Sequence, residues 1–237
     1  MKILYIFPHP DDESFGPAAA IWNQIQQGNE VYLLTLTKGG ATKVRFQYQY
    51  SIEQMGNVRY AEMQQVAQVL QLANLTVLDL PDSGLKELDP RLIEQAVEQH
   101  MALIQPHIVV TYPVHGISGF HDHLVTHAVV KRVFVTMQDR GCNYLKRLAF
   151  FTLSEETANA NQGIHRLQGS KPDEIDCITP LSAADNEKMN EALNCYQTYT
   201  TVITDSIKKS GVFTHACFEI FKEQHQPPLT ALTHKLS

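Results

Sequence analysis

The stretch Ile3-Leu4-Tyr5-Ile6-Phe7-Pro8-His9-Pro10-Asp11-Asp12-Glu13 joins an apolar run to a group of polar side chains. The apolar run predicts a buried first strand over residues 3–7. Open α/β sheets bind ligands at the carboxyl ends of their strands, which is where these polar residues fall. One histidine and two carboxylates in this turn are donors suited to a divalent metal ion. A simpler interpretation is a polar turn in which Asp12 caps a helix over residues 14–27.

Bulk composition narrows the class of protein. The 237 residues suffice for one well-buried core, and the formal net charge of −6 argues against a nucleic-acid partner. No apolar run approaches the roughly 20 residues that span a bilayer, and Pro8 interrupts the first run too early for a signal peptide. The sequence is compatible with a homo-oligomer. We expect a cytoplasmic protein with reduced thiols, because no Cys-x-x-Cys pair occurs among Cys142, Cys177, Cys195 and Cys217.

Strand and helix patterns alternate along the first two-thirds of the chain. Helices are predicted over residues 18–25, 57–70 and 90–104 and around residues 189–196, and loops over 42–56 and 159–171. The predicted strands are 3–7, 31–37, 76–80, 108–112 and 148–153, with an outer strand at 175–178 and a last strand or helix at 216–221.

This alternation predicts an α/β fold. We expect a Rossmann-like three-layer sandwich with a mostly parallel sheet and a site at the carboxyl ends of its strands. No repeat or linker divides the chain, so we expect a single domain over residues 1–237. Residues 224–237 contain two prolines and little pattern, which indicates a peripheral tail.

A second polar cluster, Gly116-Ile117-Ser118-Gly119-Phe120-His121-Asp122-His123, follows the fourth predicted strand. If strands one and four lie near each other in a parallel sheet, the two clusters meet at the same edge. Asp122 can cap the next helix, and His123 would then lie in its first turn.

Taken together, His9-Pro10-Asp11-Asp12-Glu13 and Asp122-His123 resemble the LmbE-like, or PIG-L type, zinc-dependent N-deacetylases. Most of the chain takes part in this resemblance, although the first motif and Asp122-His123 carry most of its specificity. Further similar segments are Thr37-Lys38-Gly39-Gly40, Arg59-x-x-Glu62, Leu80-Pro81-Asp82, a late helix with Lys188, Ala192 and Gln197, and a closing Glu219-Ile220-Phe221.

The resemblance implies that His9, Asp12 and His123 bind one zinc ion and that Asp11 is the general base. Two histidines and one carboxylate leave an open position for water, as a catalytic zinc requires. Zinc lowers the pKa of such a water from about 15.7 towards about 7. Asp11 is adjacent to a ligand yet free to take a proton and pass it to the leaving amine.

Two positions depart from the family pattern. The second motif of the family usually reads Gly-His-x-Asp-His, and its first histidine helps to stabilise the oxyanion. This chain has Phe120 at that position and His121 one residue later, so His121 reaches the site only if the loop bends differently. Losing one oxyanion donor costs roughly 10²–10³ in rate. Gly40 stands where the family commonly has glutamate.

Three further residues have a structural and a functional interpretation. Arg59 forms either a surface pair with Glu62 or, by the resemblance, a grip on a polar substrate. Asp82 is either a turn residue or a hydrogen-bond partner for a sugar hydroxyl. Asp122 is expected to cap its helix and orient a neighbouring histidine rather than to bind the metal.

Two other histidines lie near the second cluster. His127 is four residues after His123, the spacing of paired metal ligands on a helix. It is also in line with apolar residues, which favours a core histidine or one that supports a ligand. His115 is either a substrate contact or a solvent-exposed loop residue.

The leading hypothesis is a cytosolic zinc hydrolase that removes an acetyl group from the nitrogen of an N-acetylglucosamine-type derivative. The resemblance implies this acylated amino-sugar substrate. A second hypothesis is a metal-binding relative that has lost deacetylation and has a binding or regulatory role, which the departure at Phe120 keeps open. A third hypothesis is a hydrolase of another amide or ester. The predicted loop over residues 42–56 would then determine which substrate is bound.

Overall fold

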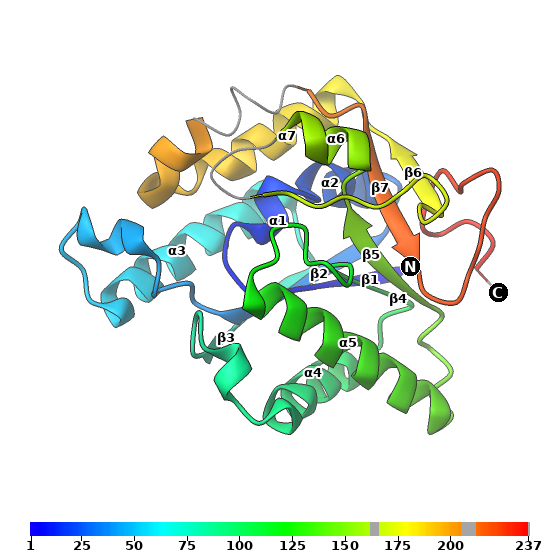
Figure 1. The fold of residues 1–237 in the computed structure, drawn as a ribbon, viewed down its shortest axis with the longest axis horizontal. Coiled ribbons are helices and arrows are strands. Elements are labelled where there is room, and N and C mark those ends of the chain that lie inside the picture. The colour runs from blue at the N-terminus through cyan, green and yellow to red at the C-terminus, as the bar shows by residue number, and fades with distance from the viewer. Residues whose placement is uncertain (162–165, 205–211, 237) are drawn as a thin grey trace.

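A seven-stranded sheet lies at the centre of the computed structural model, which describes residues 1–161, 166–204 and 212–236 (Figure 1). The strand order is β3-β2-β1-β4-β5-β7-β6, and this mostly parallel sheet confirms the predicted α/β fold. The parallel strands are β1 (Lys2–Phe7), β2 (Glu30–Thr37), β3 (Asn74–Leu80), β4 (Ile108–Thr111) and β5 (Arg147–Thr152), and β7 (His215–Ile220) and β6 (Cys177–Pro180) form the antiparallel edge.

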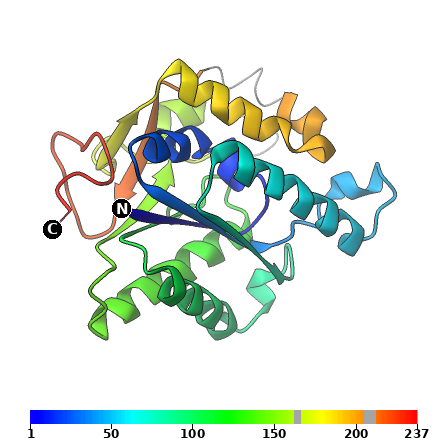
Figure 2. The ribbon, with the colours of Figure 1, turned by 180° about the vertical axis from the view of Figure 1, so that it is seen from behind.

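Helices cover both faces of the sheet. The views from the two sides show α2 (Ala18–Gln26), α3 (Ile52–Leu70) and α7 (Ala183–Asn194) on one face, with α4 (Pro90–Ile104) and α5 (His121–Asp139) on the other (Figures 1 and 2). The short helices are α1 (Asp12–Phe15), α6 (Glu155–Ala160) and the 3-10 turns η1 (Lys43–Phe46), η2 (Leu85–Glu87) and η3 (Gln197–Tyr199). No described helix is both long and apolar enough to cross a membrane.

The apolar run of β1 explains these layers. Ile3, Tyr5 and Phe7 enter the core beneath α2, α3 and α7, whereas Leu4 and Ile6 enter the core beneath α4 and α5. Successive side chains of a strand point to opposite faces, so a strand that is apolar at every position needs cover on both faces. β1 is therefore a central strand.

The strand order places the ends of β1 and β4 side by side. The chain steps from β1 to β2 and β3 in one direction, and then returns to place β4 on the other side of β1. The point where the order reverses is where open α/β sheets bind ligands. The expectation that the first and second polar clusters share an edge is thus confirmed at the level of strand topology.

The helix predicted over residues 18–25 is confirmed as α2, which begins at Ala18. The simpler interpretation, one helix over residues 14–27 capped by Asp12, is wrong, because α1 ends before Gly16-Pro17. The break follows from Pro17, which cannot continue the hydrogen bonding of a helix interior. Asp12 lies inside α1 and does not cap it.

The loop predicted over residues 42–56 is shorter in the structure. It contains η1, and α3 begins at Ile52, five residues before the predicted start at 57. Ser51 and Gln54 form a capping box there, in which each side chain bonds the backbone N–H of the other. The apolar period had not yet begun at this point, which is why the periodicity placed the start too late.

The expected peripheral tail is partly buried instead. Leu229 and Leu232 are 6% and 1% exposed and join the core beneath α2 and α7. Arg147 donates to the carbonyls of Leu232 and His234, and so attaches the tail to β5. The loop predicted over residues 159–171 includes 162–165, which lie outside the described residues.

Candidate functional site

The turn after β1 directs two adjacent carboxylates to different partners. Asp11 has a left-handed backbone, with a φ of 81°. Its carboxylate faces Arg59, whereas the carboxylate of Asp12 faces His9 and accepts the backbone N–H of that residue at 2.9 Å. This backbone position is uncommon for a residue other than glycine, so the surrounding contacts must hold it.

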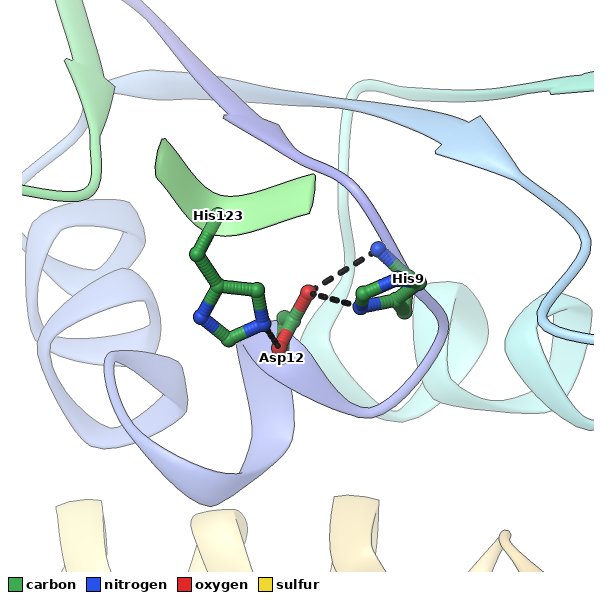
Figure 3. Close-up of side chains that lie close together, drawn as sticks. All are labelled: His9, Asp12 and His123. Carbon is green, nitrogen blue, oxygen red and sulfur yellow. Dashed lines mark hydrogen bonds and ion pairs between the residues drawn. The ribbon is translucent and has the colours of Figure 1, made fainter. Parts of the chain in front are cut away.

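Asp12 lies between two histidines that come from distant parts of the chain (Figure 3). Its Oδ2 is 3.4 Å from His9 Nδ1, and its Oδ1 is 3.3 Å from His123 Nε2. One donor atom from each of the three residues lies within 4.8 Å of the others. Two imidazole nitrogens and one carboxylate oxygen match the preferences of zinc, and three protein ligands leave a coordination position open.

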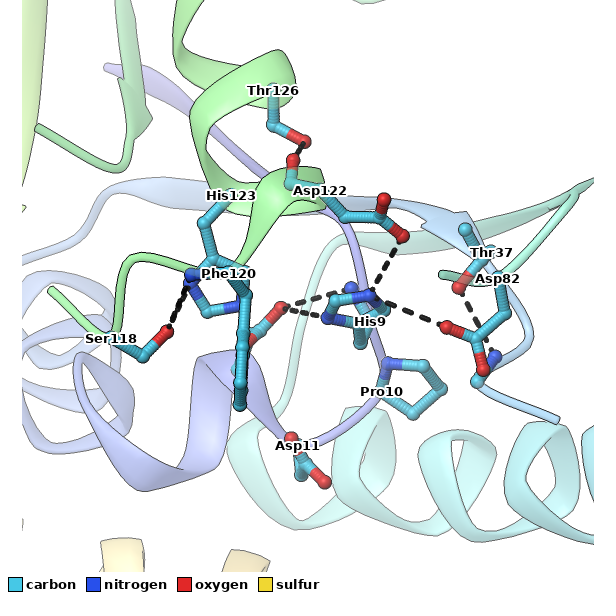
Figure 4. Close-up of polar contacts among 12 residues, drawn as sticks. His9, Pro10, Asp11, Thr37, Asp82, Ser118, Phe120, Asp122, His123 and Thr126 are labelled. Atoms are coloured by element: carbon cyan, nitrogen blue, oxygen red, sulfur yellow. Dashed lines mark hydrogen bonds and ion pairs between the residues drawn. The ribbon is translucent and has the colours of Figure 1, made fainter. Parts of the chain in front are cut away.

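The second nitrogen of each histidine is already engaged. His123 Nδ1 lies 2.9 Å from the carbonyl oxygen of Gly116. His9 Nε2 lies 3.1 Å from Asp122 Oδ2, as Figure 4 shows. With a metal ion bound, a proton on each of these nitrogens would satisfy both contacts and leave His123 Nε2 and His9 Nδ1 to bind the ion. Partners of this kind fix the tautomer and the ring orientation of metal-binding histidines.

The titration of these groups reflects the same contacts. Burial lowers the pKa of His9, but its hydrogen bonds with Asp12 and Asp122 outweigh this effect and raise that pKa to about 10. The pKa of Asp12 stays well below its usual range because the attraction of His123 and His9 outweighs the opposing effect of burial. The cluster thus holds positive charge beside an ionised carboxylate, which a metal ion would replace with loss of protons.

Asp122 does not have the predicted capping role at its own helix. The residue before α5 is Phe120, and the Asp122 carboxylate accepts the backbone N–H groups of Ser83 at 2.8 Å and Leu85 at 3.2 Å. The contact with His9 agrees with the expected orienting role. Asp122 therefore connects the start of α5, the loop after β3 and the first polar cluster.

Asp82 also lies beside His9. Its Oδ1 is 3.4 Å from His9 Nε2, and its Oδ2 accepts the N–H of Ala41 at 2.6 Å. His9, Asp82 and Asp122 could also be considered a metal-binding group. Because both carboxylates already accept backbone N–H groups, a hydrogen bond from His9 Nε2–H accounts for this arrangement.

Arg59 lies inside the protein, at 2% exposure. Its guanidinium donates to Asp11 Oδ2 at 2.5 Å, to the carbonyl of Pro10 at 2.8 Å and to the carbonyl of Gly39 at 3.1 Å. It also lies over the Tyr199 ring, 4.2 Å from the centroid. Since Arg59 and Glu62 are both buried, the interpretation as a surface pair is wrong. The contacts of Arg59 hold the turn and Asp11, and its contact with a substrate stays a prediction.

The two departures from the family pattern have clear structural settings. Phe120 is 43% exposed, and its ring meets the His123 ring edge-on at 5.5 Å between centroids. His121 is the first residue of α5 and is exposed to solvent. At Gly40, a Cβ would lie 2.2 Å from the carbonyl oxygen of Ile52, so the path of the chain into α3 excludes any side chain there.

Three buried contact residues were not anticipated from sequence. The Tyr112 hydroxyl donates to Asp12 Oδ1 at 2.7 Å, and the Tyr196 hydroxyl accepts the Asp11 N–H at 2.8 Å and donates to Glu13 at 2.6 Å. Glu13 is fully buried, and burial raises its pKa to about 7. Tyr112 directly follows a strand end, which is a usable signal, whereas nothing in the sequence relates Tyr196 to Asp11.

His127 agrees with its structural interpretation, whereas His115 is not the solvent-exposed loop residue that its structural interpretation expected. His127 is 6% exposed, and its Nδ1 bonds the carbonyl of Tyr112 at 2.9 Å, as expected for a core histidine. His115 is half-buried, and its Nδ1 accepts the N–H of Ile117 at 3.1 Å.

This fold and this donor set define a candidate metal-dependent enzyme of the α/β class. The chain belongs to the GlcNAc-PI de-N-acetylase (PIG-L) family, whose model matches residues 4–134. The matched part contains both polar clusters, from His9 to His123. The family resemblance seen in the sequence is thereby confirmed.

Curated relatives and solved structures agree with this assignment. One relative is 1D-myo-inositol 2-acetamido-2-deoxy-alpha-D-glucopyranoside deacetylase from Mycolicibacterium smegmatis, to which the chain is 28% identical over 151 residues. The aligned segment covers 55% of this chain and 52% of the relative. The chain thus spans about half the length of the curated relatives that it matches. The crystal structure of the zinc-inhibited form of teicoplanin deacetylase Orf2 has a TM-score of 0.68 at 12% identity, covering 94% of this chain and 99% of that chain.

A hydratase has the same fold. The 4-carboxy-2-hydroxymuconate hydratase from Pseudomonas putida KT2440 has a TM-score of 0.69 at 14% identity and covers 100% of this chain and 99% of its own. The fold by itself therefore does not select the reaction.

Proposed function

We propose that this chain is a zinc-dependent N-deacetylase that removes the acetyl group from an N-acetylated amino sugar. The observation that carries this proposal is the convergence of His9, Asp12 and His123 at the point where the strand order reverses, with Asp11 next to them. Membership of a de-N-acetylase family and the name of the Mycolicibacterium smegmatis relative support the substrate class. A zinc ion held by these three residues would polarise the amide carbonyl and lower the pKa of water.

Asp11 is the proposed general base. Arg59 holds its Oδ2, which leaves Oδ1 to take a proton from the attacking water and pass it to the leaving amine. Burial raises the pKa of Asp11 to about 6, although the charge of Arg59 opposes this shift. A pKa closer to neutrality suits a residue that both accepts and returns a proton.

In this proposal, the other predicted site residues orient the ligands and the base or contact the substrate. Asp122 orients His9, and Arg59 holds Asp11. Asp82 is partly exposed beside His9, so it remains our candidate for a sugar hydroxyl. His121 would contact the substrate from the solvent side, with a smaller expected contribution than the buried residues.

Phe120 supports a second candidate function, a metal-binding protein without deacetylase activity. Its phenyl ring, which lies edge-on to the His123 ring, cannot donate a hydrogen bond to an oxyanion. The loss of one oxyanion donor lowers the rate by roughly 10²–10³ and does not remove the metal.

Zinc content and acetate release together test the proposal. We expect about one zinc per chain and release of acetate from N-acetylglucosamine-type substrates. Asp11→Asn should keep its zinc and lose roughly 10²–10⁴ in rate, because it removes the base and leaves all three ligands in place. The readouts are metal analysis of the purified protein and an assay of released acetate.

The same assays separate the two candidates. Zinc without acetate release across a broad panel of N-acetyl sugars, together with a gain of activity in Phe120→His, would favour the metal-binding function. An unchanged zinc content in His9→Ala would contradict both candidates, since both depend on the same ligands.

A further inference from the structure

Tyr112 lies immediately after β4 and touches two of the three proposed ligands. Its hydroxyl donates to Asp12 Oδ1 at 2.7 Å. Its ring is stacked on the imidazole of His123, with 4.2 Å between centroids and 8° between planes. At 6% exposure, Tyr112 is a buried side chain that contacts both polar clusters.

The surrounding core holds Tyr112 in place. Its ring packs against Phe7 at 4.9 Å between centroids, and its carbonyl bonds His127 Nδ1 at 2.9 Å. These contacts hold the hydroxyl as a fixed donor to Asp12 Oδ1.

The two oxygens of Asp12 each receive one hydrogen bond from a fixed donor. Oδ1 accepts the Tyr112 hydroxyl, and Oδ2 accepts the backbone N–H of His9. These two bonds prevent rotation of the carboxylate. Its remaining lone pairs then face the side chains of His9 and His123, where the proposed ligand atoms converge (Figure 3).

We propose that Tyr112 is a positioning residue that sets the zinc affinity of this site, by fixing the carboxylate of Asp12 with its hydroxyl and the imidazole plane of His123 with its ring. This inference rests on the metal site of the proposed function, and it is independent of which substrate is used. Groups that orient metal ligands in this way typically contribute 10–100-fold to metal affinity.

Tyr112→Phe tests this role because it removes the hydroxyl and retains the ring. We expect zinc to bind roughly 10–100-fold more weakly than to the wild type, measured by competition with a chromophoric chelator. With Co²⁺ in place of zinc, the visible absorption bands should also shift, because a carboxylate free to rotate changes the geometry at the metal. Thermal unfolding of the metal-free protein shows that the variant is folded.

Tyr5→Phe is the matched control. The Tyr5 hydroxyl is also buried, but it donates to Gln24 Oε1 at 3.0 Å and contacts none of the proposed ligands. This variant loses one buried hydrogen bond of similar length, so it should keep the zinc affinity and the Co²⁺ spectrum of the wild type.

Equal zinc affinities in Tyr112→Phe and Tyr5→Phe would overturn the inference, whether both variants match the wild type or both bind zinc more weakly. Failure of the wild type to bind zinc would overturn it together with the metal site. Zinc binding without acetate release from any substrate would reject the deacetylase function alone. A selective loss in Tyr112→Phe would then still support the role of Tyr112.

Discussion

Asp11 and Asp12 are neighbours with the same side chain, yet their environments assign them different chemistry. The left-handed backbone at Asp11 turns one carboxylate towards Arg59 and the other towards the two histidines. Burial raises the pKa of Asp11 against the opposing charge of Arg59, whereas burial of Asp12 is outweighed by the attraction of His123 and His9, which lowers its pKa. Pairs of acids with separated pKa values are typical of sites in which one group is charged and the other moves a proton.

Glu13 leads to a prediction about pH and stability. Its pKa is raised by burial from 4.5 to about 7, so between these values the folded protein retains a proton that the unfolded chain has released. The contribution of Glu13 to folding therefore decreases as the pH rises through this interval. In Glu13→Gln, which cannot ionise, the free energy of unfolding should fall less between pH 5 and pH 8 than in the wild type.

Urea denaturation of the zinc-free protein at both pH values measures this difference. Glu87→Gln, which changes an exposed residue of η2, serves as the control. Equal changes with pH in Glu13→Gln and the wild type would show that Glu13 keeps an ordinary pKa in the folded protein.

At the scale of elements, the loop between β4 and α5 shapes one side of the site. Gly116 has a φ of 63°, and its carbonyl oxygen lies 2.9 Å from His123 Nδ1. A Cβ at this position would lie 2.9 Å from the Cβ of His123. The loop therefore needs glycine both for its backbone conformation and for space beside a proposed ligand.

Gly116→Ala and Gly141→Ala form a matched pair for this loop. Gly141 also has a positive φ, of 85°, but a Cβ there would meet nothing within 4 Å. Both variants should lose about 1–2 kcal/mol of unfolding free energy, the usual cost of a left-handed backbone. We expect weaker zinc binding in Gly116→Ala alone, by chelator competition, since it displaces His123. An equal zinc affinity in both variants would contradict this view of the loop.

On the scale of the whole molecule, the C-terminal segment is part of the core. Arg147 on β5 pairs with Glu223 at 2.7 Å and donates to the tail carbonyls of Leu232 and His234. Its side chain is 1% exposed, whereas that of Glu223 is 28% exposed. These contacts attach β5 to residues that were predicted from the sequence to form a peripheral tail.

Arg147→Leu should destabilise the protein by about 3 kcal/mol in chemical denaturation. The change removes one partner of a largely buried ion pair and leaves two tail carbonyls without their donor. Arg140→Leu is the surface control, because Arg140 pairs with Glu98 in an exposed position and its loss should cost about 0–1 kcal/mol. A similar small loss in both variants would show that the tail contributes little to stability.

Local pattern accounted for much of the fold. The helix over Pro90–Ile104 was predicted with its bounds because Asp89 and Pro90 mark its start and a regular apolar stripe runs along it. The start of α2 at Ala18 was predicted, but the start of α3 was missed, because a capping box begins that helix before its apolar period. The buried tail was missed because the contacts that hold it come from distant residues.

By itself, the sequence determined the α/β class, the family and the two clusters that supply His9, Asp12 and His123, since each of these depends on residues close together in the chain. The tertiary structure decided how those clusters are joined and supported: β4 lies beside β1, Asp122 turns to His9 rather than to its own helix, and Arg59 is buried against Asp11. The physical reason is separation along the chain. A hydrogen bond between residues tens of positions apart has no local pattern, and only packing of the sheet and its helices brings such groups within reach.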